Sequence, residues 1–582
     1  MREENLELLR RLVQAPLPPL SAPEPGSPRV IPEESRSGLP TARVVAQRSR
    51  YLHSRYDPRR EAQRLAASRE GYLVLLGFGL GYLAAALGEL PGVTGVLAVE
   101  PAPQVASLLR EGVSLDHLCE VSPKVRLRFL EEPRRLGEEL FSFYLPMLDG
   151  RITLLIAEGY EELVDLAPFR DAFNDGVARL AGNYRTMARL GRGWTMNIIR
   201  NCRRLAEGAS DRFGLAAPPA RPAGRLILAG AGPSLATFLG EADSRGWPSH
   251  GPGEGETLLL AADTALPILR SHGIRADLVL SIDAQSATYL HYLPAPGPQP
   301  RMILADLTAP VSLAGESLPL ALFAGGHPLG AMLLRREEGV LPLSTEGGNV
   351  GYTLLSAADA LGAREVSCYG LDYAYLSGAP YARGSYLDSY FLTRTDRVEP
   401  LCSRWTQLLW RDPEARRIED APPWSYTDPR LDRFRERFGS LKKQLQARGV
   451  RFHRAPRGGF APAGGVIPGG GVIPAGGVTP AGGVIPGGGV TPAGGEDGKR
   501  PAALPRIVSP RGLTESLEEL KTALATEVDP AARPPWLLSP VERALLPLAA
   551  WVVEHSDRGE GGWSLEEAAR VTDTLLEGRT PA

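Results

Sequence analysis

Short apolar runs alternate with segments of helical periodicity through the middle of the chain. The runs predict strands at 226–228, 257–261, 278–282, 302–305, 320–323 and 365–369. Residues 349–361 form an amphipathic pattern that predicts a helix before the last of these strands. Short strands separated by helices indicate a mostly parallel sheet that is buried on both faces. We therefore expect a central α/β domain.

A second α/β pattern comes earlier in the chain. Strands are predicted at 72–76 and 93–99, with a glycine turn at 77–81 after one and Glu100 after the other. This arrangement occurs in dinucleotide-binding folds and in methyltransferases that bind S-adenosylmethionine. A single fingerprint of this kind more often marks a Rossmann-like scaffold without a ligand, so both interpretations stay open. Further strands of the same sheet are expected at 125–129 and 151–156.

The remaining segments are predicted to be helical or irregular. In the helical stretch 164–206, Trp194, Asn197 and Asn201 share one face, which favours an interdomain helix with satisfied polar groups. Residues 462–495 repeat a Gly/Pro-rich hexapeptide whose burial cannot offset its ordering entropy, so a flexible loop is expected. The expected domains are an N-terminal helical and linker region (1–65), a Rossmann-like domain (66–160), connecting helices and linker (161–222), the central α/β domain (223–400), a helical extension (401–460), the repeat (461–500) and a C-terminal helical region (501–582).

Charge and cysteine content narrow the class of protein. The 65 Lys and Arg nearly balance the 67 Asp and Glu, which argues against a dedicated nucleic-acid binder. No apolar run reaches the ~20 residues that span a bilayer, and the first residues are acidic where a signal peptide is basic. The 4 cysteines are scattered without metal-ligand spacing. We expect a reduced cytoplasmic protein without stable membrane insertion.

The strongest local signal is the turn that follows the strand at 226–228. Gly230 and Gly232 allow a close approach to the backbone, Pro233 and Ser234 follow, and a helix is expected from Leu235. Unpaired amides at the start of a helix favour anions, so a phosphate or diphosphate is the predicted guest. An ordinary strand-to-helix turn is the alternative.

Carboxylates follow several strands of the predicted central sheet. They are Asp263, Asp283, Asp306 and Asp372. Ligands of parallel sheets bind at the carboxyl ends of the strands, which is also where the glycine turn lies. One such acid is explained by helix capping, whereas several at one edge indicate a site.

Four motifs of the central domain occur together in a known family. They are Gly230–Leu235, Ala261–Leu266, Gly273–Asp283 and Gly370–Tyr375. The combination resembles the motility accessory factor (Maf) family of bacterial flagellin glycosyltransferases, over roughly residues 70–460. The glycine-rich unit that ends in Glu100-Pro101 and the helix with Asn183, Trp194, Asn197 and Asn201 also look like that family.

The resemblance implies a fold and an activity. The fold is multi-domain α/β, with a Rossmann-like N-terminal unit, a central sialyltransferase-like domain of GT-A/Rossmann type, and a helical C-terminal region. The activity is transfer of a nonulosonic acid from a CMP-activated donor to Ser or Thr hydroxyls of flagellin. Archaeal relatives of the central domain are 6-hydroxymethylpterin diphosphokinases, which use ATP. The length of this chain favours the first group.

The resemblance also suggests roles for individual residues. Asp372 and His327 are candidates for the general base, and Asp283 is a further catalytic candidate. A histidine is common in the family where this chain has Tyr381–Gly384. Any role of that histidine is therefore either missing from this chain or performed by another residue. The residues expected to hold the nucleotide are Gly230, Gly232, Pro233, Ser234, Leu235, Asp263, Thr264 and Asp283.

No metal site is predicted for the transferase. A diphosphokinase would need magnesium, for which Asp263 and Asp283 are the sensible pair. A non-catalytic adaptor that binds nucleotide or flagellin is another hypothesis. A methyltransferase centred on 77–100 is a more distant one.

Overall fold

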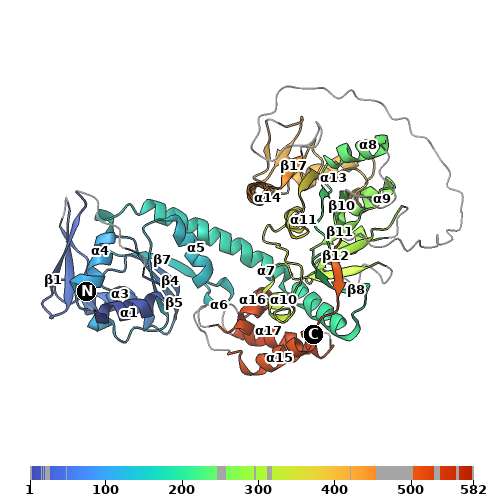
Figure 1. Cartoon of the computed structure of the whole chain (residues 1–582). Helices are drawn as coiled ribbons and strands as arrows, with labels where there is room; N and C mark the ends of the chain where they lie inside the picture. The colour runs from blue at the N-terminus through green and yellow to red at the C-terminus, as the bar shows by residue number, and fades with distance from the viewer. Residues whose placement is uncertain are drawn as a thin grey trace. The chain divides into compact units, whose positions relative to one another are not determined.

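The chain folds into two compact units. One comprises Met1–Met196 with Glu518–Ala582, and the other comprises Asn197–Leu517. This computed structural model describes all residues except 1–2, 15, 18, 20–25, 47–48, 246–256, 294–296, 311–317, 420, 454–502, 530–537, 559–562 and 580–582. The multi-domain α/β architecture expected from the sequence is confirmed (Figure 1).

A parallel sheet forms the core of the N-terminal unit, with strand order β6-β5-β4-β7. Its strands are β4 (Gly71–Leu76), β5 (Val93–Glu100), β6 (Val125–Phe129) and β7 (Ile152–Ile156). Side chains 72–76 are buried because helices such as α3 (Tyr82–Gly88) pack on this sheet. The strands predicted from the apolar runs are confirmed to within about a residue at each end.

Residues 1–65 hold more regular structure than the expected helix and linker. They form α1 (Glu3–Val13), α2 (Pro58–Ala66) and a three-stranded antiparallel sheet of β1 (Arg29–Glu34), β2 (Pro40–Val45) and β3 (Arg50–Tyr51). The prolines that suggested a linker occupy positions that a sheet tolerates. Pro32 lies in the edge strand β1 and Pro40 begins β2, where a missing amide proton costs little.

The C-terminal helices belong to the N-terminal unit. They are the last part of α15 (Leu513–Thr526), α16 (Pro540–Glu554) and α17 (Trp563–Leu576). Ser539 and Glu542 close a capping box at the start of α16. The backbone of α16 lies directly against α7 (Ala167–Gly208), because a Cβ added at Gly191 would be only 1.7 Å from the Pro547 carbonyl oxygen.

The second unit is built around a nine-stranded sheet with order β17-β14-β9-β10-β11-β12-β13-β8-β18. All neighbouring pairs are parallel except β18 with β8. The strands are β8 (Phe213–Ala217), β9 (Arg225–Ala229), β10 (Thr257–Ala262), β11 (Leu278–Ser281), β12 (Met302–Asp306), β13 (Leu320–Phe323), β14 (Glu365–Tyr369), β17 (Arg451–His453) and β18 (Arg506–Val508).

Strand order places the topological switch point between β9 and β14. From β9 the chain adds β10 to β13 on one side, and it then returns to add β14 on the other side. Helices α8 (Leu235–Arg245) and α9 (Leu266–Ser271) cover one face, and α11 (Val350–Ala360) and α14 (Pro429–Ala447) cover the other. Ligands of such sheets bind where the strand order reverses, at the carboxyl ends of the strands.

The Gly/Pro repeat lies outside the described residues, but its flanking strands are described. β17 precedes it at one edge of the sheet and β18 follows it at the other edge. With strands about 4.8 Å apart, these edges are roughly 38 Å from each other. The segment that contains the repeat therefore connects opposite edges of the sheet.

The C-terminal part of α7 holds two loops at the carboxyl edge of the sheet. The side-chain amide of Asn197 donates to the carbonyl oxygens of Ala284 and Thr308, at 3.3 and 2.7 Å. Asn201 is buried and donates to the carbonyl oxygens of Leu307 and Ala309, at 2.9 Å each. The predicted helix face with satisfied amides is confirmed for these two residues.

We expect Asn201→Asp to destabilise this contact strongly. The variant removes both donors and buries a carboxylate beside two carbonyl oxygens, which costs about 3 kcal/mol. Hydrogen exchange of peptides covering β12 should accelerate accordingly. Asn183→Asp, on an exposed position of the same helix, is the matched control and should leave that exchange unchanged. Equal exchange rates in both variants would show that the hydrogen bonds of Asn201 do not hold the loop after β12 in place.

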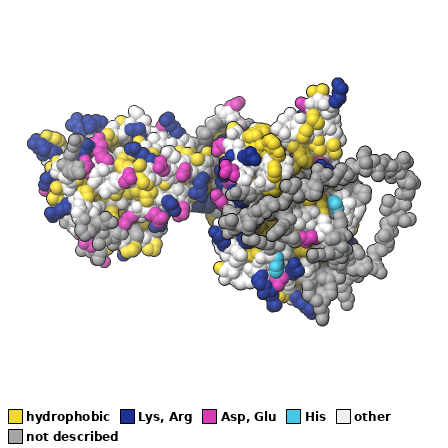
Figure 2. Space-filling model, turned by 90° about the horizontal axis from the view of Figure 1, so that it is seen from above, with side chains coloured by type: hydrophobic (Ala, Val, Ile, Leu, Met, Phe, Trp, Pro, Cys, Tyr) yellow, Lys and Arg dark blue, Asp and Glu magenta, His cyan; other side chains and the backbone are white. Residues whose placement is uncertain are grey.

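Charged side chains of both signs are interspersed on the visible face of the N-terminal unit (Figure 2). This distribution agrees with the near balance of acidic and basic residues in the sequence. Within the described part of the chain, every helix is too short or too polar to cross a membrane.

Candidate functional site

The glycine turn of the N-terminal unit is filled by the protein's own side chains. Gly77 and Gly79 have φ angles of +99° and +58°, which favour glycine. A Cβ at Gly77 would be 2.5 Å from the Tyr160 ring, and one at Gly79 would be 2.5 Å from His53 Nε2. The contacts favour the scaffold interpretation of this unit.

Glu100, the acid of the same fingerprint, is also engaged within the protein. Its Oε2 accepts from the amides of Phe78 and Gly79 at 3.2 Å and from the Tyr160 hydroxyl at 2.5 Å. Its Oε1 accepts from the Ala102 amide at 2.9 Å. Burial raises the pKa of Glu100 to about 7, although these donors act in the opposite direction. The Glu100 side chain therefore stabilises the glycine turn at 77–81 and has its acceptor sites occupied by groups of the protein.

The glycine turn of the central sheet lies against the segment that follows β14. The Gly230 amide donates to the Tyr369 carbonyl at 2.8 Å, and the Gly232 amide donates to the Gly370 carbonyl at 2.9 Å. A Cβ at Gly230 would be 2.2 Å from the Gly370 oxygen, and one at Gly232 would be 2.3 Å from Asp372 Oδ2. These glycines are therefore needed for the contact between two loops at the switch point.

Ser234 and Asp372 connect the same two loops. The Ser234 amide donates to Asp372 Oδ2 at 3.0 Å, and Ser234 Oγ accepts from the Gly370 amide at 2.9 Å. The Leu235 amide donates to the Gly232 carbonyl at 3.0 Å. Burial raises the pKa of Asp372, against the hydrogen bonds from Ser234. The carboxylate thus positions the turn. The amides of Gly232, Ser234 and Leu235, which were predicted to be unpaired donors for a phosphate, all donate to acceptors within the protein. Phosphate binding at this turn and base catalysis by Asp372 stay predictions.

The segment after Asp372 brings tyrosines beside two of the predicted carboxylates. The Ala382 amide donates to the Ala231 carbonyl at 2.8 Å, which ties this segment to the glycine turn. Burial raises the pKa of Tyr381, and it raises that of Tyr386 to about 12; Asp263 and Asp283 contribute in the same direction. Both hydroxyls remain protonated at neutral pH and can donate to a ligand.

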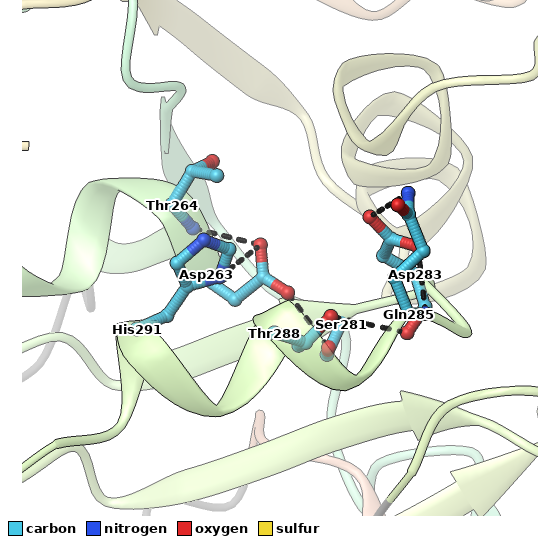
Figure 3. Close-up of polar contacts among 7 residues, drawn as sticks. All are labelled: Asp263, Thr264, Ser281, Asp283, Gln285, Thr288 and His291. Atoms are coloured by element: carbon cyan, nitrogen blue, oxygen red, sulfur yellow. Dashed lines mark hydrogen bonds and ion pairs between the residues drawn. The ribbon is translucent and has the colours of Figure 1, made fainter. Parts of the chain in front are cut away.

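Asp263 is the centre of a buried polar cluster at the ends of β10 and β11 (Figure 3). Its Oδ2 accepts from the Ser281 hydroxyl at 2.7 Å, and its Oδ1 accepts from the Thr264 amide at 2.7 Å. Nδ1 of His291 lies 3.5 Å from the same Oδ1. The His291 ring packs on Tyr386, with 4.7 Å between ring centroids. The predicted Asp263 and Thr264 therefore lie together with a histidine that the sequence analysis missed.

Asp283 is exposed and has different partners. It accepts from the Gln285 amide at 3.0 Å and from the Gln285 side chain at 3.2 Å. Figure 3 shows its carboxylate turned toward Gln285, whereas Asp263 faces His291 and Thr264. In the part of the chain that the structure describes, no group of three or more His, Cys, Asp or Glu could hold a metal ion.

His327 lies elsewhere along the sheet. It caps α10 (Pro328–Leu333), with Nδ1 accepting from the Leu329 amide at 3.2 Å. It follows β13, which is four strand spacings, or roughly 19 Å, from β9. Burial lowers the pKa of His327 to about 4, so the imidazole is neutral at pH 7. The structure thus separates His327 from the glycine turn, and its proposed role as base stays a prediction.

His291 and Ser281 carried only weak signals in the sequence. Ser281 is the last but one residue of a predicted strand, and His291 follows Asp283 in a segment without clear periodicity. Their significance comes from contact with Asp263, which depends on β10 and β11 being neighbours.

Known proteins resemble this chain in its central domain and in its fold. Residues 197–378 match a family described as 6-hydroxymethylpterin diphosphokinase MptE-like. The fold resembles the solved structure of a MAf glycosyltransferase from Magnetospirillum magneticum AMB-1, with a TM-score of 0.51 and 12% identity over 98% of this chain and 89% of that one. Both findings confirm the resemblance expected from the sequence, and the second confirms the fold.

Two uncharacterized proteins of Treponema pallidum (strain Nichols) are also similar. One is 32% identical over 130 residues, which is 22% of this chain and 45% of that protein. The other is 31% identical over 173 residues, which is 28% of this chain and 57% of that protein. The chain thus spans about half the length of the curated relatives it matches.

Proposed function

We propose that this chain is a glycosyltransferase that transfers a nonulosonic sugar from a CMP-activated donor to a Ser or Thr hydroxyl of flagellin. Support comes from the fold, which matches that of a MAf glycosyltransferase over 98% of the chain. The observation that carries the proposal is that the glycine turn, Asp263 and Asp283 follow three neighbouring parallel strands at one edge of the sheet. The segment that follows β14 reaches the same edge, because the Ala382 amide donates to the Ala231 carbonyl and the Tyr386 ring packs on His291, the partner of Asp263.

In this proposal each group at the carboxyl edge of the sheet has a defined role in binding the donor or in catalysis. The phosphate of CMP lies near the start of α8, where the helix dipole favours an anion although the amides of the turn donate within the protein. Tyr381 and Tyr386 supply hydroxyl donors to the departing phosphate, which needs its growing negative charge stabilised. Asp283, whose carboxylate is exposed, accepts hydrogen bonds from the ribose or the cytosine. The acceptor hydroxyl approaches the anomeric carbon from the opposite side.

A diphosphokinase is the second candidate, because residues 197–378 match the MptE-like family. That reaction requires magnesium to bridge ATP phosphates. The acids proposed for the metal, Asp263 and Asp283, have separate partners. Tight magnesium-dependent binding of ATP, with AMP release in the presence of a hydroxymethylpterin, would favour this alternative.

Calorimetric titration of the full chain with CMP tests the proposal. We expect CMP to bind without added metal, and Asp283→Asn to weaken binding about 10-fold or more, as expected for loss of a charged hydrogen-bond acceptor. Asp412→Asn is the matched control. Asp412 also accepts from an amide two residues later, at 2.9 Å, but belongs to the segment between α13 (Leu401–Leu409) and β15 (Arg416–Arg417).

Transfer itself is read from the intact mass of flagellin after incubation with a CMP-activated nonulosonate. The expected result is a mass increase equal to one or more sugar residues. Binding of magnesium-ATP without any binding of CMP would overturn the proposal in favour of the diphosphokinase.

A further inference from the structure

Asp263 and His291 form a buried carboxylate–imidazole pair at the proposed site. They are 4% and 6% exposed, so both are removed from water. Asp263 follows β10, whereas His291 ends the 3₁₀ helix η5 (Ser286–His291) that comes after β11. The distance from Nδ1 to Oδ1 is 3.5 Å, and Nδ1 has no hydrogen bond of ordinary geometry to any described residue. Contacts between catalytic groups are often long before the substrate binds.

The carboxylate of this pair is held firmly in place. Its Oδ2 accepts from Ser281, and its Oδ1 accepts from the Thr264 amide. A carboxylate fixed in this way orients an imidazole and stabilises the imidazolium when the ring gains a proton. With Nδ1 directed toward Asp263, Nε2 lies on the opposite side of the ring.

The groups around the imidazole belong to the proposed site. Tyr386 packs against the ring, and it comes from the same post-β14 segment that contacts the glycine turn through Ala382. Burial raises the pKa of Tyr381 and of Tyr386, and the charges of Asp263 and Asp283 act on both hydroxyls in the same direction. The pair is therefore part of the edge at which the nucleotide donor is proposed to bind.

We propose that His291 is the catalytic base of the glycosyl transfer and that Asp263 is its positioning residue. This inference rests on the proposed function. The acceptor hydroxyl gives its proton to Nε2 of His291 as its oxygen bonds to the anomeric carbon of the sugar. The bond from that carbon to the phosphate oxygen breaks, and its electron pair leaves with CMP. The proton is later released to solvent.

The other candidate bases are engaged differently. Asp372 Oδ2 accepts from the Ser234 amide and holds the glycine turn. His327 caps α10 at the end of a strand distant from the switch point. Of the three, only His291 combines a carboxylate partner with a place beside the tyrosines.

The test separates chemistry from donor binding. CMP release is measured with CMP-N-acetylneuraminate and CMP-pseudaminate as donors, with and without flagellin. His291→Gln should lower kcat about 10²- to 10⁴-fold, the usual contribution of a general base, while the Kd for CMP changes less than about threefold. His272→Gln, at the exposed C-terminus of α9, is the matched control and should keep wild-type kcat.

A pH profile and a second variant exclude a merely structural role. Wild-type kcat should fall on acidification, because a protonated imidazole cannot accept the hydroxyl proton, and His291→Gln should lose this dependence. The titratable groups around the pair are Tyr292, Tyr381, Tyr386 and the more distant Asp283. Asp263→Asn removes the carboxylate that faces the ring, so it should lower kcat and also displace the acid limb. Unchanged melting temperatures show that the variants fold.

The possible outcomes distinguish the two proposals. Wild-type kcat in His291→Gln, with CMP binding intact, would overturn the assignment of the base and leave the proposed function standing. A wild-type chain that neither binds CMP nor consumes either donor would overturn the proposed function and this inference with it.

Discussion

Gly370→Ala is expected to destabilise the second unit (Asn197–Leu517) by about 3 kcal/mol and to weaken CMP binding at least tenfold. Gly370 has a φ of +65°, a conformation that costs an L-residue about 1–2 kcal/mol. A Cβ there would also lie 2.1 Å from the Gly230 carbonyl oxygen. Both partners are backbone at the ends of neighbouring strands, so neither can move away as a flexible side chain would.

The disturbance should reach the donor site directly. The Gly370 amide donates to Ser234 Oγ, and the Gly370 carbonyl accepts from the Gly232 amide. Displacing this residue therefore displaces the turn that is proposed to hold the phosphate. Hydrogen exchange of β9 and β14 measures the stability change, and calorimetry with CMP measures binding.

Gly240→Ala is the matched control for this variant. Gly240 is exposed in α8, and a Cβ there would meet nothing within 4 Å. Alanine should stabilise the helix by about 0.5–1 kcal/mol without altering CMP binding. If Gly370→Ala behaved like Gly240→Ala, the close contact between the two loops would be wrong.

Raising the pH from 5 to 8 is expected to destabilise the N-terminal sheet, and Asp149→Asn should remove much of this loss. Asp149 is buried, its Oδ2 accepts from the Leu145 amide at 2.8 Å, and its Oδ1 has no hydrogen-bond partner in the described structure. Burial raises the pKa of Asp149 from 3.8 to about 7.

The sign follows from proton linkage. Between pH 3.8 and about 7 the folded chain holds this proton and the unfolded chain does not, so stability falls as the pH rises through that window. From pH 5 to 8 the loss from Asp149 amounts to about 3 kcal/mol. Glu100, with its pKa also raised to about 7 by burial, adds to the loss in the wild type and in the variant.

Hydrogen exchange of β4 and β5 at several pH values, corrected for intrinsic rates, measures this dependence. Asp149→Asn should be more stable than the wild type at pH 8, and this difference should be about 3 kcal/mol smaller at pH 5. Asp171→Asn, at an exposed position of α7, is the control and should keep the wild-type pH dependence. Equal slopes for the wild type and Asp149→Asn would show that Asp149 is ionised in the folded chain throughout.

The sequence by itself determined the local elements and the type of fold. Apolar runs such as 226–228 and 72–76 are buried on both faces of a sheet, so composition alone marks them as strands. The glycine turn at 230–232 and the shared helix face of Asn197 and Asn201 could also be predicted from the sequence, because backbone freedom and helix periodicity are local properties. The Maf-like motifs extended this reading to the overall architecture.

Only the tertiary structure decided which residues meet. The order of strands places Gly370 against Gly230, although the two residues are far apart in the chain. It also places His291 beside Asp263, although His291 lies in a segment without a recognisable motif. It also turned Asp372 toward the Ser234 amide. Strand pairing and side-chain burial depend on the whole core being assembled, whereas sequence patterns report only the neighbours along the chain.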